Sequence, residues 1–129
     1  MSQWYLDTSA ALKLMVEEAE SSALAQRLDT ESADLVACLL LETELRRAAH
    51  RHAGLTQELV SRFVERIDLY EVPASLFREA GLLAASSLRS LDGLHLAAAV
   101  RIGVDAVVTY DVRMAQASRE LGLAVIAPA

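Results

Sequence analysis

The sequence has few of the residues that cross-link a small chain or break its regular structure. Its 129 residues include one cysteine, two prolines and five glycines, with no low-complexity tract. A single cysteine excludes a disulfide within the chain, and the apolar neighbours of Cys38 favour a small buried side chain over a nucleophile or a ligand. The hydrophobic content of 53% argues against disorder and predicts one compact domain over residues 1–129.

Long hydrophobic runs are also missing. The longest, residues 35–41, is far shorter than the roughly 20 residues that a helix needs to span a bilayer. The strand and helix pattern begins within the first few residues, so we expect no signal peptide, no membrane contact and a cytoplasmic location.

Positive charge is scarce. The net charge is −6, and Lys13 is the only lysine among the twelve basic residues. Taken alone, this balance disfavours nucleic acid as a partner, because binding through counterion release needs clustered basic side chains. Acidic residues that converge on a bound cation would nevertheless cancel part of the excess locally. Arginine suits bidentate phosphate contacts, although its dominance over lysine is equally explained by genome composition.

The hydrophobic pattern alternates between strands and helices. We expect strands at 3–7, 33–37, 68–72, 106–111 and 123–127, and helices at 9–16, 19–28, 39–52, 56–67, 75–89, 91–102 and 112–121. Thr56 is a plausible helix cap, and Gly54, Gly103 and Gly122 fit helix stop signals. Strands separated by helices predict βαβ units, and therefore a mostly parallel sheet covered on both faces.

Four acidic residues stand where that fold would gather them. Asp7 and Asp111 each end a predicted strand, and the carboxyl ends of parallel strands are where ligands bind. Asp92 opens a helix and Glu44 lies inside one. A plainer alternative stays open for each residue: the three aspartates can serve as helix N-caps, and Glu44 can be a surface acid that pairs with Arg47.

Hydroxyl side chains next to these acids favour a site. Thr8 and Ser9 follow Asp7, and Thr109 lies two residues before Asp111. A hydroxyl alone would cap a helix, so the combination is better explained by a shared function. Carboxylates crowded at one sheet edge repel one another unless a divalent cation neutralises them, and Mg²⁺ or Mn²⁺ prefers such oxygen ligands.

Zinc is disfavoured by the placement of the histidines. His50 and His52 lie two apart on a predicted helix and therefore diverge, and no histidine has a cysteine at metal-ligand spacing. We expect His95, within the apolar stretch of residues 93–100, to be a packed or partly exposed helix residue.

Three stretches together resemble the PIN-domain ribonucleases, specifically the VapC-type toxins of bacterial toxin–antitoxin pairs. They are "YLDTSAALKL" at 5–14, "LLLETELRRAA" at 39–49 and "SLDGLHLAAAVRIGVDAVVTYDVRMAQAS" at 90–118, and the resemblance covers essentially the whole chain. It implies a PIN-like three-layer α/β sandwich in which helices flank a short, mostly parallel central sheet.

The resemblance also implies the activity and its residues. Asp7, Glu44, Asp92 and Asp111 would be the catalytic acids that bind Mg²⁺ or Mn²⁺ and cleave RNA, which arrests translation and growth, with Ser9 and Thr109 as supporting hydroxyls. Glu44 is chosen over Glu42 because "LRRA" follows it, and Glu42 is expected to face Arg46. Arg113 stands where some members carry another acid, and Gly93 where alanine is common.

The partners implied are an RNA substrate, a VapB-type antitoxin whose tail covers the site, and a second copy of the chain in a homodimer. Residues 12–66, with Leu12, Leu14, Met15 and Val16, can supply a groove for that tail, with core packing as the alternative. The candidates for RNA phosphate contacts are Arg46, Arg47, Arg51, Arg89 and Arg113, which can equally be solvated helix charges.

Three other functions use aspartates in a similar place. A haloacid-dehalogenase-type phosphatase needs an aspartate where Ser9 stands, and a phospho-acceptor receiver domain needs a lysine after a late strand, whereas the chain has only Lys13. A non-catalytic PIN-like module that binds metal or protein stays open, because it would keep the same acids.

Overall fold

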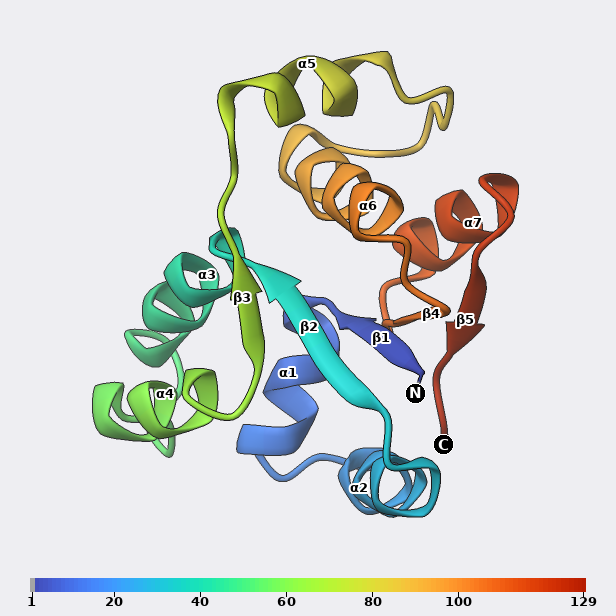
Figure 1. Ribbon diagram of the computed structural model, residues 1–129. Helices are drawn as coiled ribbons and strands as arrows, with labels where there is room; N and C mark the ends of the chain where they lie inside the picture. Colours follow the sequence, from blue (N-terminus) through green and yellow to red (C-terminus); the bar gives the residue numbers. More distant parts are fainter. Residues whose placement is uncertain (1) are drawn as a thin grey trace.

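The computed structural model describes residues 2–129, which form a five-stranded parallel sheet with helices on both sides (Figure 1). The strand order across the sheet is β3-β2-β1-β4-β5. The strands are β1 (Gln3–Leu6), β2 (Asp34–Cys38), β3 (Asp68–Tyr70), β4 (Ala106–Val108) and β5 (Ala124–Ile126). The helices are α1 (Thr8–Met15), α2 (Ser21–Glu31), α3 (Leu40–Ala49), α4 (Gln57–Val64), α5 (Ala74–Leu82), α6 (Ser90–Ile102) and α7 (Val112–Glu120).

The three central strands are apolar without alternation, as expected for a parallel sheet covered on both faces. Tyr5 of β1 lies opposite Val36 of β2 and Val107 of β4, and all three are at most 1% exposed. Leu6 and Val108 continue the pair of β1 with β4. The hydrophobic core therefore runs through the centre of the sheet, and β1 and β4 end side by side.

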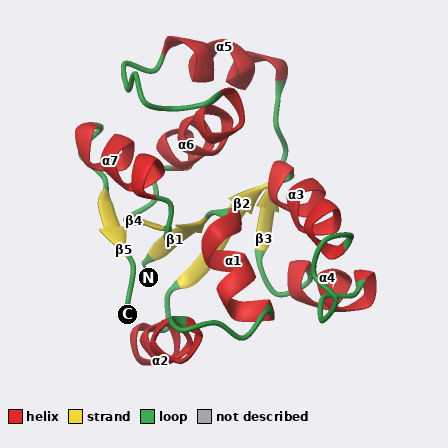
Figure 2. Cartoon of the chain, turned by 180° about the vertical axis from the view of Figure 1, so that it is seen from behind, coloured by secondary structure: helices red, strands yellow, loops and turns green. Residues whose placement is uncertain are grey.

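Helices α1 to α4 lie on one side of the sheet and α5 to α7 on the other (Figures 1 and 2). The strand order explains this division, because right-handed crossovers place helices on opposite faces when the chain reverses its direction across the sheet. The chain moves from β1 to β3 and then crosses back to β4 and β5. The predicted three-layer arrangement is confirmed, and every strand pair in it is parallel.

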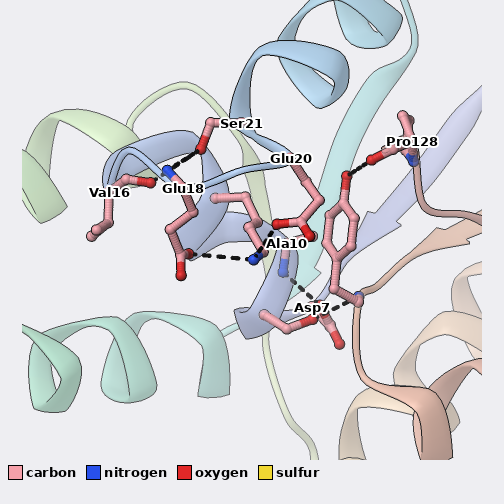
Figure 3. Close-up of polar contacts among 10 residues, drawn as sticks. Asp7, Ala10, Val16, Glu18, Glu20, Ser21 and Pro128 are labelled. Carbon is pink, nitrogen blue, oxygen red and sulfur yellow. Dashed lines mark hydrogen bonds and ion pairs between the residues drawn. The ribbon is translucent and has the colours of Figure 1, made fainter.

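The connection from α1 to α2 is held by polar contacts (Figure 3). Ser21 Oγ accepts a hydrogen bond from the Glu18 N–H at 2.9 Å and donates one to the Val16 carbonyl at 3.2 Å. Lys13 Nζ of α1 lies 2.7 Å from Glu20 Oε1 and 3.6 Å from Glu18 Oε1. These contacts hold the C-terminal end of α1, whose first turn carries Thr8 and Ser9.

The predicted elements all form, but several helix ends differ. The helix expected at 75–89 ends at Leu82, and the chain is irregular from there to Ser90. Ser86 and Ser87 form a turn in this segment, and Ala85 just before them packs in the core. The helix expected at 39–52 ends at Ala49, before Gly54, so Gly54 is not its stop signal.

Three other expected helix ends are confirmed. Thr56 caps α4, with its Oγ1 accepting the Leu59 N–H at 3.1 Å. Gly103 ends α6 and Gly122 follows α7, both with φ of +80°, which glycine adopts without strain. No helix within residues 2–129 combines the length and the hydropathy that crossing a membrane requires.

Candidate active site

The four predicted acids line one pocket of about 100 Å³ at the carboxyl end of β1 and β4. The lining residues are Asp7, Thr8, Ser9, Glu44, Asp92, His95, Asp111 and Met114. They come from the first turn of α1, from α3, from the first turns of α6, and from the start of α7. The parallel sheet therefore brings together residues that are far apart in the sequence, at the edge where such sheets bind ligands.

Asp7 is the most deeply buried of these acids, with 4% of its surface exposed. Its Oδ1 accepts hydrogen bonds from Ser9 Oγ at 2.7 Å and from the Ala10 N–H at 2.9 Å (Figure 3), and its Oδ2 accepts one from Thr109 Oγ1. Burial raises the pKa of Asp7 against the opposing effect of these donors. Both oxygens are thus fixed in orientation, and the residue caps α1 at the same time.

The two predicted supporting hydroxyls join the end of β1 to the end of β4. Ser9 Oγ accepts the Tyr110 N–H at 2.9 Å, and Thr109 Oγ1 accepts the Asp111 N–H at 3.1 Å. Each hydroxyl therefore receives a backbone hydrogen bond while it donates its proton to Asp7. This double use explains why a hydroxyl stands next to each aspartate.

Glu44 faces the pocket, so the alternative of a surface acid paired with Arg47 is wrong. Its Oε1 accepts hydrogen bonds from Thr8 Oγ1 at 2.6 Å and from His95 Nε2 at 2.5 Å. Burial raises the pKa of Glu44, but the contacts with His95 and Thr8 outweigh it and lower the pKa overall. The expectation that Glu42 faces Arg46 is confirmed, since Arg46 Nε lies 2.9 Å from Glu42 Oε2.

His95 is packed, as expected, but it also lines the pocket; it is 2% exposed and has polar partners on both ring nitrogens. The sequence signal for this role is the spacing between His95 and Asp92. Asp92 and His95 are three residues apart, which places them on the same face of α6. A histidine on the same helix face as a candidate metal ligand is a candidate member of the site.

The N-cap alternative is confirmed for Asp111 as well as Asp7, and wrong for Asp92. Asp111 Oδ1 accepts the backbone N–H groups of Arg113 at 2.8 Å and Met114 at 3.0 Å. Asp92 lies within the first turn of α6, whose N-cap is Arg89. Across residues 2–129 no hydrogen bond joins the Asp92 carboxylate to another side chain. Capping and a role in the site coexist in the two residues that do cap.

The pKa of Asp92 is raised, first by burial and then by the negative charges of Asp111 and Glu44. The carboxylates are therefore close enough to repel one another. No three acidic, histidine or cysteine side chains among residues 2–129 form a ready-made metal centre. The donor set nevertheless fits a hard divalent cation, because it consists of carboxylate and hydroxyl oxygens and its excess negative charge is what a cation would neutralise.

None of the candidate RNA-binding arginines lines the pocket. Arg46 is held by Glu42 and lies 3.2 Å from both Gln57 Oε1 and Ser61 Oγ. Arg89 lines a different cavity, between α5 and α6. Arg47, Arg51 and Arg113 are exposed. Contacts of these side chains with RNA phosphates stay a prediction.

The sequence matches the model of the PIN domain family over residues 4–120. It is also 41% identical to Ribonuclease VapC46 of Mycobacterium tuberculosis (strain ATCC 25618 / H37Rv), over 99% of both chains. The chain belongs to the PIN-domain family, in its VapC group. A second VapC relative from the same strain, Ribonuclease VapC35, is 39% identical over 96% of both chains.

Crystal structures of VapC proteins share the fold at low sequence identity. VapBC2 from Rickettsia felis, bound to a fragment of its promoter DNA, matches with a TM-score of 0.73 at 12% identity, over 98% of this chain and 99% of the other. VapC20 from Mycobacterium tuberculosis, a toxin that cleaves the sarcin-ricin loop, gives 0.72 at 15% identity, over 88% and 94% of the two chains. The PIN-like fold predicted from the motifs is thereby confirmed.

Proposed function

We propose that this chain is the toxin of a toxin–antitoxin pair and acts as a metal-dependent endoribonuclease. The observation that carries the proposal is the convergence of Asp7, Glu44, Asp92 and Asp111 on one pocket in a chain of the VapC group. Relatives at 39–41% identity are named ribonucleases, and the VapC20 structure is described as a toxin that cleaves RNA of the sarcin-ricin loop.

These four carboxylates would hold Mg²⁺ or Mn²⁺. A bound divalent cation supplies positive charge for the phosphate in the transition state and lowers the pKa of the attacking water. Ser9 and Thr109 hold Asp7 in one orientation, and the backbone N–H groups at the start of α7 hold Asp111. These residues would thus hold carboxylate oxygens in fixed directions toward a cation in the pocket. Cleavage of the RNA would arrest translation and growth.

A VapB-type antitoxin is the proposed protein partner. Two structural neighbours, from Rickettsia felis and Haemophilus influenzae, are VapBC assemblies. In this chain, a hollow of about 240 Å³ between α1 and α4 is lined by Leu14, Met15, Leu59 and Phe63 together with Arg62 and Arg66. Apolar walls with two arginines suit a partner segment that carries apolar and acidic side chains.

The stretch 12–66 is thus consistent with both interpretations given from the sequence, a groove for the antitoxin tail and core packing. Leu12, Leu14, Met15 and Val16 are half-buried and pack against the core, and Leu14 and Met15 also form a wall of that hollow. Homodimerisation and a cytoplasmic location belong to the same proposal. Light scattering on the purified chain and cell fractionation test these two points.

The deciding experiment maps new RNA 5′ ends in cells that briefly express the chain without its antitoxin. Asp92→Asn is the best inactive variant, because the Asp92 carboxylate has no hydrogen bond to another side chain within residues 2–129 and an asparagine oxygen can still accept the backbone hydrogen bond of Arg89. Glu44→Gln and Glu42→Gln form a matched pair on α3, since Glu44 lines the pocket and Glu42 pairs with Arg46.

Discrete 5′ ends with the wild type and Glu42→Gln, and none with Asp92→Asn or Glu44→Gln at equal soluble levels, are the expected result. These ends would also name the substrate. Identical maps for all four proteins would refute the nuclease and favour the non-catalytic PIN-like module that binds metal or protein.

A further inference from the structure

A buried hydrogen-bond network runs from the pocket into the core. Its members other than Glu44 have no role in the proposed chemistry. The Cys38 N–H donates to Tyr5 Oη at 3.2 Å, Tyr5 Oη lies 2.8 Å from His95 Nδ1, and His95 Nε2 lies 2.5 Å from Glu44 Oε1. Tyr5 is 1% and His95 2% exposed. This network connects the end of β2, the middle of β1, α6 and α3.

The direction of the last bond follows from the chemistry of its two groups. An ionised carboxylate can only accept a hydrogen bond, so His95 Nε2 must carry the proton and donate it to Glu44. In the neutral ring, Tyr5 donates to Nδ1; in the charged ring, Nδ1 donates to Tyr5. Both states keep the bond from Nε2 to Glu44. His95 Nε2 therefore donates to Glu44 whatever the charge of the ring.

Packing fixes the imidazole ring as well. The rings of Tyr5 and His95 meet edge to face, with centroids 5.8 Å apart and an interplanar angle of 71°. The ring is thus held on one nitrogen by Tyr5 of β1 and on the other by Glu44 of α3. Because the ring is fixed, its Nε2 donor fixes the orientation of the Glu44 carboxylate.

The effect on Glu44 is to distinguish its two oxygens. Oε1 accepts hydrogen bonds from both Thr8 Oγ1 and His95 Nε2, and among residues 2–129 no hydrogen bond reaches Oε2. A glutamate side chain on a helix has three rotatable bonds, and fixing them in advance removes an entropic cost from binding. Rotating this carboxylate would break two hydrogen bonds at once.

We propose that His95 is a positioning residue, which holds Glu44 so that Oε2 is presented to the divalent cation in the pocket. The inference rests on the proposed function. It assigns to His95 a role in the site that a simple core position would not have, since Tyr5 and Cys38 both contact Nδ1 and the partner of Nε2 is Glu44.

Two substitutions separate the two bonds of the ring. In His95→Gln the amide nitrogen reaches the position of Nε2, so the donor to Glu44 is kept and the contact with Tyr5 is lost. In His95→Asn the amide reaches only the position of Nδ1, so the contact with Tyr5 is kept and the donor to Glu44 is lost. Both variants are polar and each keeps one of the two bonds, which makes them a matched pair for stability.

The test titrates Mn²⁺ into the purified full chain without RNA and measures affinity by calorimetry or electron paramagnetic resonance. We expect His95→Asn to weaken Mn²⁺ binding about 10–100-fold, as is typical when a group that orients a metal ligand is removed, and His95→Gln to weaken it by less than about tenfold. Asp92→Asn serves as the variant that loses a proposed ligand.

Equal affinities for the wild type, His95→Gln and His95→Asn, with weaker binding only in Asp92→Asn, would overturn the positioning role and leave the proposed function intact. No Mn²⁺ binding by any of the four proteins would overturn the metal-dependent function instead.

A second measurement needs neither metal nor a folded His95 variant. NMR of the ¹⁵N-labelled imidazole in the metal-free wild type should show a proton on Nε2 that exchanges slowly with water, and Glu44→Ala should abolish that protection. A wild-type Nε2 proton that exchanges freely, or one unaffected by Glu44→Ala, would overturn the inference.

Discussion

Thr109→Val tests whether the hydroxyls at the sheet edge hold Asp7 in place. Thr109 is 1% exposed; its hydroxyl donates to Asp7 Oδ2 and accepts the Asp111 N–H at 3.1 Å. Valine has nearly the same shape but makes neither bond. The substitution therefore removes a hydrogen bond to a charged group and leaves a backbone N–H without its partner.

A hydrogen bond to a charged group contributes about 1.5–3 kcal/mol, and a buried unpaired donor adds its own penalty, so we expect a loss of about 2–4 kcal/mol in the free energy of unfolding. With a urea m-value of about 2 kcal/mol/M, the unfolding midpoint of the metal-free protein should fall by about 1–2 M. Thr109→Ser is the matched control, because it keeps the hydroxyl and loses one buried methyl group, at a cost of about 1 kcal/mol.

The free energy of unfolding should depend on pH with a definite sign. Burial raises the pKa of Asp7 above its unfolded value, so stability falls as pH rises from the unfolded pKa through the folded one, where the buried carboxylate loses its proton. The Thr109 hydrogen bond acts in the opposite direction, and its removal raises the pKa of Asp7 further. The stability gap between Thr109→Val and the wild type should therefore widen with pH. A valine variant as stable as the serine variant, or a gap independent of pH, would refute this reasoning.

Three further predictions concern the pocket and α6. Without metal, Asp92→Asn should be more stable than the wild type in urea at neutral pH, because it removes a carboxylate whose ionisation is disfavoured by burial and by Asp111 and Glu44; equal or lower stability would contradict this. Mn²⁺ at about 100 times its dissociation constant should stabilise the wild type by about 2.7 kcal/mol in thermal unfolding and should stabilise Asp92→Asn by less; equal stabilisation of both would count against the site. Gly93→Ala should add up to about 1 kcal/mol of stability without affecting RNA cleavage, because the new Cβ would lie in ordinary contact with Ala80, 3.5 Å from its carbonyl oxygen and 3.8 Å from its Cβ; a destabilised variant would show that α5 and α6 are packed more tightly than this geometry allows.

The order of strands and helices was predictable because it depends on local signals. Apolar runs such as 35–38 and 106–108 indicate strands buried on both faces of a sheet, and the spacing of apolar residues in 40–49 indicates a helix. Asp7 and Asp111 could be placed at one edge because parallel strands all end on the same side. The early end of α5 could not be predicted, because the residues after Leu82 keep helix-forming composition and their turn depends on packing Ala85 against the core.

The sequence by itself determined the types of groups in the site, four carboxylates with hydroxyls beside them, and through the strand pattern it also determined their edge of the sheet. Only the tertiary structure decided which atoms meet. Thr109 reaches Asp7 across 102 residues and His95 reaches Glu44 across 51, and no local pattern encodes either contact. The physical reason is that periodicity reports which face of an element is buried, whereas a hydrogen bond between two elements depends on how they pack together in three dimensions.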